Sequence, residues 1–353
     1  MAGEPRVEGS SVAHEATVLE VRHLGVEYLT GDAPVRAVDD VSLILRRGEF
    51  LGLVGESGCG KSTLCFAIAR LLGDNAEITD GEILFSGKNL VHLREKQLRH
   101  LRWRELSVVM QSAMNALNPV MTVGAQLADA MRAHDKLPAR EVRKRGSAVL
   151  ELVGIDPIHL NSYPHQLSGG MRQRAMIAMA LVFIPDLIIM DEPTSALDVV
   201  AQRSLMVQVK ELQRELGFAV IFVTHDISLI ARFSDRLAIM YAGEIVEMGG
   251  TRQVFEDPKH PYSRGLLGAF PSIRGPKEVL KGIPGSPPDL RHPPSGCRFH
   301  PRCQYVMDIC PTAPPPAYTP RGNDLVRCYL YAGRGTPETD MEEAEDRERH
   351  ALR

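Results

Sequence analysis

The sequence has no apolar run long enough to cross a membrane. About 18 to 20 consecutive apolar residues are needed to span a bilayer, whereas the runs here, such as residues 187–190, have the length of a strand. The first 16 residues are acidic and rich in small side chains, and they lack the basic and apolar regions of an export signal. We therefore expect a chain that does not span a membrane and that works in the cytoplasm.

The chain also has little net charge and little cysteine. Its 41 basic and 44 acidic residues leave a formal charge of -3, so no global basic field favours nucleic acid as a partner. Six cysteines among 353 residues are too few for a disulfide scaffold. Hydrophobic residues make up 44% of the chain, which is typical of soluble globular proteins and predicts about two domains with a sizeable core.

Short apolar and β-branched runs alternate with helical patterns along the first two thirds of the chain. This alternation predicts an α/β fold with a mostly parallel sheet, because parallel strands need helical crossovers. The predicted strands are 18–29, 37–45, 50–54, 82–85, 106–110, 187–191, 219–224 and 237–240.

The composition changes mark the domain boundaries that we expect. Residues 1–16 are a flexible leader, and residues 17–270 form the α/β domain, with a helical subdomain inserted at about 122–180. Residues 271–336 form an irregular, separately held extension, because the eleven prolines between positions 284 and 320 exclude long helices and central strands. Residues 337–353 form an acidic tail.

The sequence GESGCGKS at residues 55–62 matches the phosphate-loop pattern G-x-x-x-x-G-K-[ST] between a predicted strand and a predicted helix. Its glycines let the backbone wrap a phosphate chain, and the helix N-terminus attracts that chain. A glycine-rich turn that arose by chance is the alternative. We expect Lys61 to reach the β- and γ-phosphates and Ser62 to offer its hydroxyl to Mg²⁺. The expected nucleotide contacts are Gly55, Glu56, Ser57, Gly58, Cys59, Gly60, Lys61, Ser62 and Thr63.

Two acids end the predicted strand at 187–191. Asp191 and Glu192 stand at the carboxyl edge of the sheet, where ligands of open α/β folds bind. Asp191 is expected to hold Mg²⁺, and Glu192 to orient or deprotonate the water that attacks the γ-phosphate. A strand that ends in solvated acids is the alternative.

Between these motifs, LSGGMRQR at residues 167–174 leads into a helical pattern. Ser168 is a good N-cap, and Gly169 and Gly170 leave the helix N-terminus bare for an anion, although a simple capped helix is the alternative. The order of the three motifs resembles the ATP-binding cassette family, whose signature is LSGGQ; here Met171 replaces the glutamine. The resemblance covers about residues 17–270 and implies that Ser168, Gly169 and Gly170 contact the ATP of a second subunit.

The resemblance also assigns roles to residues outside the three motifs. Gln111 matches the loop glutamine that contacts Mg²⁺ and water, and His225 matches the switch histidine near the γ-phosphate. Residues 195–198 match the loop that meets the other subunit. Tyr28 resembles the aromatic residue that stacks on adenine, with a packing role as the alternative.

Three further segments narrow the resemblance. Residues 114–119, 260–267 and 296–303 resemble the ATPase subunits of dipeptide and oligopeptide permeases, with nickel permeases as close relatives. The resemblance implies a bacterial importer ATPase, peripheral on the cytoplasmic side of the membrane. Its implied partners are a second, non-identical ATPase subunit, two transmembrane permease subunits and an external substrate-binding protein. A soluble cassette ATPase and a redox or iron-sensing module are the alternatives.

Four cysteines, Cys297, Cys303, Cys310 and Cys328, lie in the last sixth of the chain. With five, six and seventeen residues between successive cysteines, they lack the close pairs of an ordinary zinc ribbon, so spacing leaves zinc, an iron–sulfur cluster and free thiols open. Resemblance to the dipeptide permease group implies a 4Fe–4S cluster at these positions.

Overall fold

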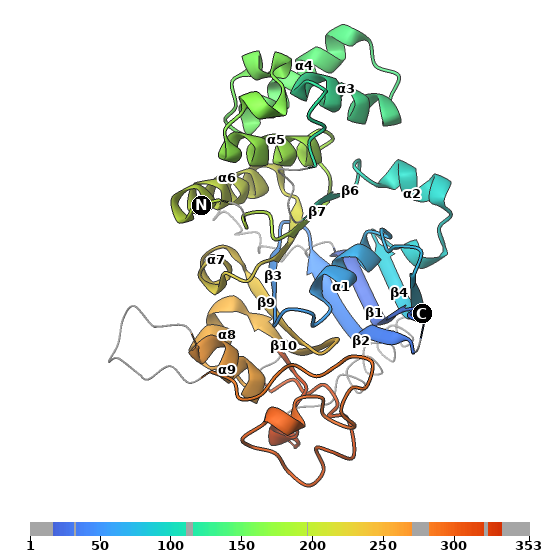
Figure 1. Cartoon of the computed structure of the whole chain (residues 1–353), viewed down its shortest axis with the longest axis vertical. Coiled ribbons are helices and arrows are strands. Elements are labelled where there is room, and N and C mark those ends of the chain that lie inside the picture. The colour runs from blue at the N-terminus through green and yellow to red at the C-terminus, as the bar shows by residue number, and fades with distance from the viewer. Residues whose placement is uncertain are drawn as a thin grey trace, which may run out of the picture.

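The computed structural model describes residues 17–31, 33–110, 116–195, 197–269, 282–320 and 324–333, and two sheets form their centre (Figure 1). The larger sheet has the strand order β11-β10-β9-β3-β8-β7-β6. Its strands are β3 (Phe50–Val54), β6 (Leu106–Val109), β7 (Leu187–Asp191), β8 (Ala219–Val223), β9 (Arg236–Tyr241), β10 (Glu244–Gly250) and β11 (Leu325–Val326).

Five neighbouring strands of this sheet, from β9 to β6, pair in parallel, which confirms the predicted α/β class. Every residue of β3, β7 and β8 is buried. Continuous apolar runs are expected in such strands, because both faces of a parallel sheet are covered. The carboxyl ends of β3, β7 and β8 lie at one edge, so the segments that follow them are brought together.

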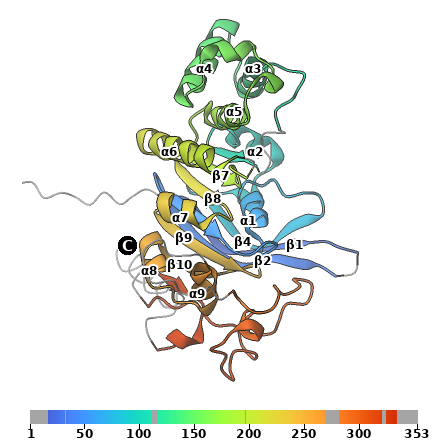
Figure 2. The same cartoon turned by 60° about the vertical axis from the view of Figure 1, so that its left-hand side comes forward.

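The smaller sheet is antiparallel and lies beside helix α1 (Lys61–Ile68) (Figure 2). Buried residues from this sheet, from α1 and from the larger sheet share one core cluster, which includes Leu19, Leu53, Leu64 and Ile189. The strands of the smaller sheet are β1 (Thr17–Tyr28), β2 (Val35–Arg46), β4 (Ala76–Phe85) and β5 (Lys88–Asn89).

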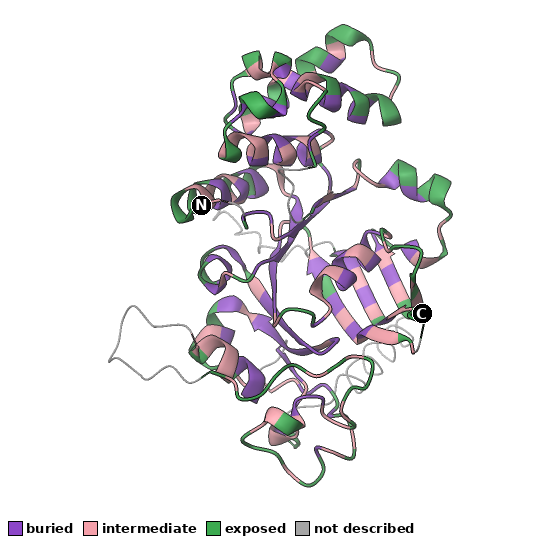
Figure 3. Ribbon diagram, viewed as in Figure 1, coloured by how far each residue is buried: buried purple, intermediate pink, exposed green. Residues whose placement is uncertain are grey.

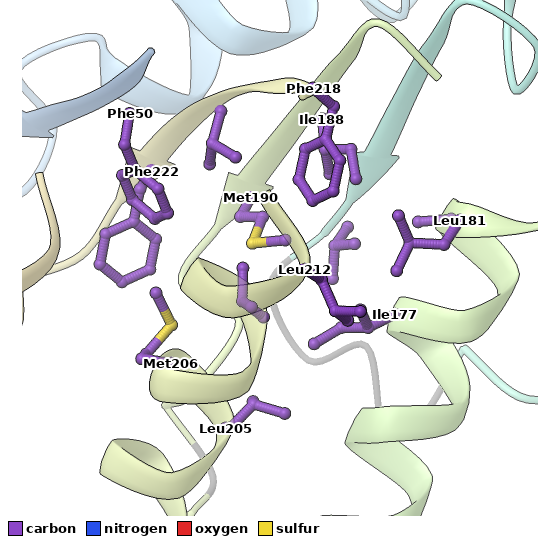
Figure 4. Packing of buried hydrophobic residues seen from close by; sticks show 14 of the residues in the cluster. Phe50, Ile177, Leu181, Ile188, Met190, Leu205, Met206, Leu212, Phe218 and Phe222 are labelled. Carbon is purple, nitrogen blue, oxygen red and sulfur yellow. The ribbon is translucent and has the colours of Figure 1, made fainter. Parts of the chain in front are cut away.

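Helices cover the other face of the larger sheet with a second core (Figure 4). Leu205, Met206 and Leu212 of α6 face Phe222 and Met190 of the sheet. The helices involved are α5 (Gly169–Leu181), α6 (Val199–Leu216) and α7 (Ile227–Phe233). Asp198 caps α6 by accepting the Ala201 N–H, and Gly217 ends it with φ 74°.

A group of helices lies at the far end of the molecule from β10 (Figures 1 and 2). It contains α3 (Val123–His134), α4 (Ala139–Leu152) and the short 3-10 helices η3 (Pro157–Asn161) and η4 (Pro164–Gln166), and α5 leads back to the sheet. Their outer faces are exposed, whereas the sheet strands are buried (Figure 3). Among the residues that the structure covers, no helix is long and apolar enough to cross a bilayer.

The remaining short helices connect the sheets or follow them. Helix α2 (Glu95–Leu101) and the 3-10 helix η1 (Leu90–His92) come after β5, and α8 (Thr251–Glu256) and α9 (Pro261–Gly268) follow β10. Residues 282–320 and 324–333 are mostly irregular, with the 3-10 helices η5 (His300–Arg302) and η6 (Tyr329–Tyr331).

This last segment does not stand apart from the α/β domain, contrary to the sequence-based expectation. Strand β11 pairs with β10, and Arg298 lies 3.1 Å from the carboxylate of Glu244 and also contacts Asp39. The Arg327 guanidinium donates to Asp40 at 2.7 Å. Because a proline-rich backbone forms few hydrogen bonds of its own, the segment is held by strand pairing and arginine contacts to its neighbours.

Candidate functional site

The loop between β3 and α1 wraps tightly because two of its glycines have no side chain. A Cβ on Gly60 would lie 2.1 Å from the carbonyl oxygen of Ala37, and Gly60 has φ 106°. A Cβ on Gly55 would lie 2.1 Å from the Met240 carbonyl oxygen. No other residue type fits these positions without moving the backbone.

Lys61 begins α1 and turns its ammonium back over the loop. Its Nζ donates to the carbonyl oxygens of Gly55 and Glu56, both at 2.9 Å, and lies 3.6 Å from the Cys59 sulfur. The positive charge is therefore held at the concave side of the loop, beside the N-terminus of α1. Both features attract phosphate.

Asp191 ends β7 beside the start of α1. Its carboxyl group is buried and accepts a hydrogen bond from the side chain of Ser62. Burial raises the pKa of Asp191, and the Ser62 hydrogen bond opposes that rise. The pair places a hydroxyl and a carboxylate together, and these oxygen ligands are the ones that Mg²⁺ prefers.

Glu192 and His225 face each other at the same edge. Glu192 adopts φ 48°, and its N–H donates to the Val223 carbonyl oxygen at 2.9 Å. This bond fixes the turn that directs the Glu192 carboxylate toward the end of β8, where its Oε1 lies 3.6 Å from the exposed His225 Nδ1. The carboxylate one residue after Asp191 and the imidazole of His225 thus stand together at this edge of the sheet.

The structure brings Tyr28, at the end of β1, to the phosphate loop. Its hydroxyl lies 3.3 Å from the Thr63 hydroxyl. A strand far from the loop in sequence thus presents an aromatic ring at the edge of the site.

The LSGG segment is not joined to this group. Ser168 caps α5, with its hydroxyl accepting the Met171 N–H at 3.3 Å, and Ser168 and Gly169 are exposed. Helix α5 belongs to the helical side of the molecule, whereas α1 lies against the smaller sheet (Figures 1 and 2). Gln111 lies outside the described residues.

The four cysteines lie in the segment 297–328, and each sulfur accepts a hydrogen bond from a backbone N–H. The donors are Phe299 for Cys297, Tyr305 for Cys303, Met307 for Cys310 and Leu330 for Cys328. Burial raises the pKa of Cys297 to about 12 and that of Cys328 to about 11, so the unliganded thiols are protonated at neutral pH.

The metal predicted at these cysteines is not supported by their arrangement. Within the part of the chain that the structure describes, no group of three or more His, Cys, Asp or Glu side chains could hold a metal ion. Burial raises the pKa of Cys297 and Cys328, and this opposes the thiolate form that a metal requires.

Two contacts to Glu56 were not predicted from the sequence. Arg302 donates to both Glu56 carboxylate oxygens, and the Tyr262 hydroxyl accepts the Glu56 N–H at 2.9 Å. Arg302 is 246 positions away from Glu56, so no local pattern signals the pair. The available signal in the sequence was Glu56 itself, because an acid within a loop that binds anions requires a cation nearby to compensate for its charge.

The fold and this arrangement define a P-loop nucleoside triphosphatase. A family model described as ABC transporter matches residues 38–195, and another, described as oligopeptide/dipeptide transporter, C-terminal region, matches residues 246–310. The chain belongs to the ABC transporter family and is an ATPase of its ATP-binding cassette type.

Several curated relatives are similar over most of their length. The dipeptide transport ATP-binding protein DppD of Bacillus subtilis is 45% identical over 89% of this chain and 94% of its own. The DppD of Caldanaerobacter subterraneus is 42% identical over 89% of this chain and 97% of its own length. The oligopeptide transport ATP-binding protein OppD of Escherichia coli is 44% identical over 84% and 89%.

Solved structures agree with the cassette fold. The dimeric ATP-binding cassette MJ0796, bound to ADP and Pi, is 30% identical with a TM-score of 0.60, covering 66% of this chain and 99% of that one. CbiO1 from Clostridium perfringens, part of the transporter complex cbiONQ, is 31% identical with a TM-score of 0.60. The match covers 69% of this chain and 92% of CbiO1.

Proposed function

We propose that this chain hydrolyses ATP at the loop between β3 and α1 in order to energise the import of dipeptides or oligopeptides. The observation that carries the proposal is the convergence of Lys61, Asp191, Glu192 and His225 on one edge of the parallel sheet. No single motif supplies all four groups.

Lys61 and the N-terminus of α1 bind the β- and γ-phosphates, and Ser62 and Asp191 would hold Mg²⁺. When bound, this ion neutralises charge on the phosphates and orients them. The raised pKa of Asp191 reflects a buried carboxylate with few partners, which suits it to a cationic ligand.

Glu192 is the group that accepts the proton of the attacking water. Its carboxylate follows Asp191 by one residue, so it lies beyond the phosphate-binding loop on the side where a water would approach the γ-phosphate. His225, 3.6 Å away, contacts the γ-phosphate and keeps Glu192 oriented.

Tyr28 stacks on adenine, which is supported by its position beside Thr63 at the edge of the loop. Ser168, Gly169 and Gly170 contact the ATP of a partner subunit. The exposure of Ser168 and Gly169 at a capped helix N-terminus suits contact with a separate molecule. For Gln111 the role as Mg²⁺ and water contact rests on sequence resemblance.

Peptide cargo is supported by the relatives, which are named as dipeptide or oligopeptide transport proteins, and by the match at residues 246–310. The partners are a related ATPase subunit, two membrane permease subunits and an external binding protein, with this chain peripheral on the cytoplasmic side. Uptake of labelled dipeptides by the assembled transporter tests the cargo. Uptake of Ni²⁺ alone would instead favour the nickel alternative.

We further propose that Cys297, Cys303, Cys310 and Cys328 hold a 4Fe–4S cluster, with zinc as the alternative. Four N–H···S hydrogen bonds support thiolate ligation, because such bonds stabilise negative sulfur. Anaerobically purified protein should then contain about four irons per chain and absorb broadly near 400 nm. Protein free of both iron and zinc would refute any metal at these cysteines.

Glu192→Gln tests the catalytic assignment. The amide keeps the shape of the side chain but cannot accept a proton, so ATP should still bind while turnover in the assembled transporter falls by about 10²- to 10⁴-fold. Glu211→Gln, on the exposed side of α6, is the matched control and should retain full turnover. Turnover of Glu192→Gln within tenfold of the wild type would exclude Glu192 as the principal base.

A further inference from the structure

Glu56 places a carboxylate in the loop that binds the phosphates of ATP. A second negative charge beside a polyphosphate weakens binding unless a cation compensates for it, because like charges repel strongly where water is partly excluded. Lys61 bonds the backbone carbonyl of Glu56 rather than its carboxylate. The compensation must therefore come from elsewhere.

Arg302, in the cysteine-bearing segment, supplies this compensation. Its Nη1 donates to Oε2 of Glu56 at 2.7 Å and its Nη2 donates to Oε1 at 3.0 Å, which is a two-point pairing of a planar guanidinium with a carboxylate. The Arg302 side chain is only 7% exposed and that of Glu56 is 23% exposed. Salt therefore screens the pair less than it would screen one at the surface.

Arg302 is itself held in place from several sides. Its Nε donates to the Pro284 carbonyl oxygen at 2.8 Å, and its Nη1 lies 3.3 Å from the Tyr241 hydroxyl. The hydrogen bond with Glu56 is the main cause that raises the Arg302 pKa. The guanidinium is thus presented to Glu56 in a fixed orientation rather than from a mobile side chain.

The backbone of Glu56 is held by the same region of the molecule. The Tyr262 hydroxyl accepts its N–H at 2.9 Å, and the ring of Tyr262 packs against Tyr241 and Phe299 at 4.6 and 5.5 Å between centroids. Phe299 lies three residues before Arg302. One aromatic cluster therefore connects the phosphate loop to the cysteine-bearing segment.

We infer that Arg302 is a positioning residue for ATP binding, which holds Glu56 and cancels its charge so that the phosphate loop accepts a polyphosphate. This inference rests on the proposed function, because it requires ATP at the Lys61 loop. It adds Arg302, which follows the cassette in the sequence, to the nucleotide site.

The test is Mg²⁺–ATP binding to the full-length chain, measured by isothermal titration calorimetry. Arg302→Met keeps the apolar stem but leaves Glu56 unpaired, and should weaken binding by about tenfold. Adding Glu56→Gln to this variant removes the repelling charge and should restore affinity to within about threefold of the wild type. A role in packing alone would not be rescued by that second change.

Arg291→Met is the matched control, since Arg291 pairs with the exposed Asp289 in the same segment and should bind ATP like the wild type. Binding by Arg302→Met within twofold of the wild type, or a double variant as weak as Arg302→Met, would overturn the inference. If Arg302→Met does not fold, Glu56→Gln alone decides: it should bind ATP at least as tightly as the wild type, and weaker binding would overturn the inference.

Lys61→Ala distinguishes failure of the inference from failure of the proposed function. Weak binding by Lys61→Ala together with normal binding by Arg302→Met would remove only the role of Arg302. Unchanged binding by Lys61→Ala would place ATP elsewhere and overturn both.

Discussion

His260 provides a pH-dependent stability that can be worked out from the structure. It lies at the start of α9 and is 1% exposed, and its Nδ1 accepts the Tyr262 N–H at 3.0 Å. Burial, together with the nearby Arg264, lowers the pKa of His260 to about 3 from an ordinary value of 6.5, although a hydrogen bond with the Arg327 backbone opposes this change. The neutral ring is therefore part of the folded state.

The sign of the effect follows from this depressed pKa. The unfolded chain takes up a proton on His260 near pH 6.5, whereas the folded chain does so only near pH 3. The contribution of neutral His260 to the free energy of unfolding is fully present above pH 6.5 and is lost as the pH falls toward 3. At about 1.4 kcal/mol per pH unit, one unit below 6.5 removes roughly 1.4 kcal/mol from the free energy of unfolding.

Urea unfolding at pH 7.5 and pH 5.5 measures this loss. His260→Asn keeps an oxygen that can accept the Tyr262 N–H but cannot titrate, so it should lose about 1.4 kcal/mol less than the wild type between the two pH values. Burial raises the pKa of the neighbouring Glu247, but this effect is common to both proteins and cancels in the comparison. His165→Asn, at an exposed position, should behave like the wild type. Equal losses in wild type and His260→Asn would refute the argument.

Two further predictions concern the partner site and the core. Ser168→Arg should leave ATP binding to the isolated chain unchanged but abolish hydrolysis in the assembled transporter; equal impairment of binding in both would show that Ser168 acts in its own site. Phe222→Ala should lower the free energy of unfolding by about 3 to 5 kcal/mol, because the ring is fully buried against Phe50 at 5.8 Å. Urea unfolding measures this change, and a loss below 1 kcal/mol would mean that the cavity collapses.

Much of the sheet was predictable because its central strands are short apolar runs bounded by polar residues. The predicted ranges 50–54 and 187–191 coincide with β3 and β7. Strand β10 was not predicted, because it contains two glycines and the buried Glu247, whose carboxylate accepts the N–H groups of Lys259 and His260. Strand β11 has only two residues and exists through its pairing with β10.

The sequence alone determined the residues of the phosphate loop and the order of the motifs around it. Glycine at positions 55 and 60, lysine at 61 and two acids after an apolar strand are local requirements, and each can be recognised within a few positions. Parallel pairing of β3, β7 and β8 then brings them to one edge.

Only the tertiary structure decided what holds Glu56. Its two partners lie 206 and 246 positions away, at Tyr262 and Arg302, and contacts at such separations leave no periodic pattern in the sequence. They form because the ring of Phe299 packs against both Tyr241 and Tyr262, and this packing carries Arg302 to the phosphate loop.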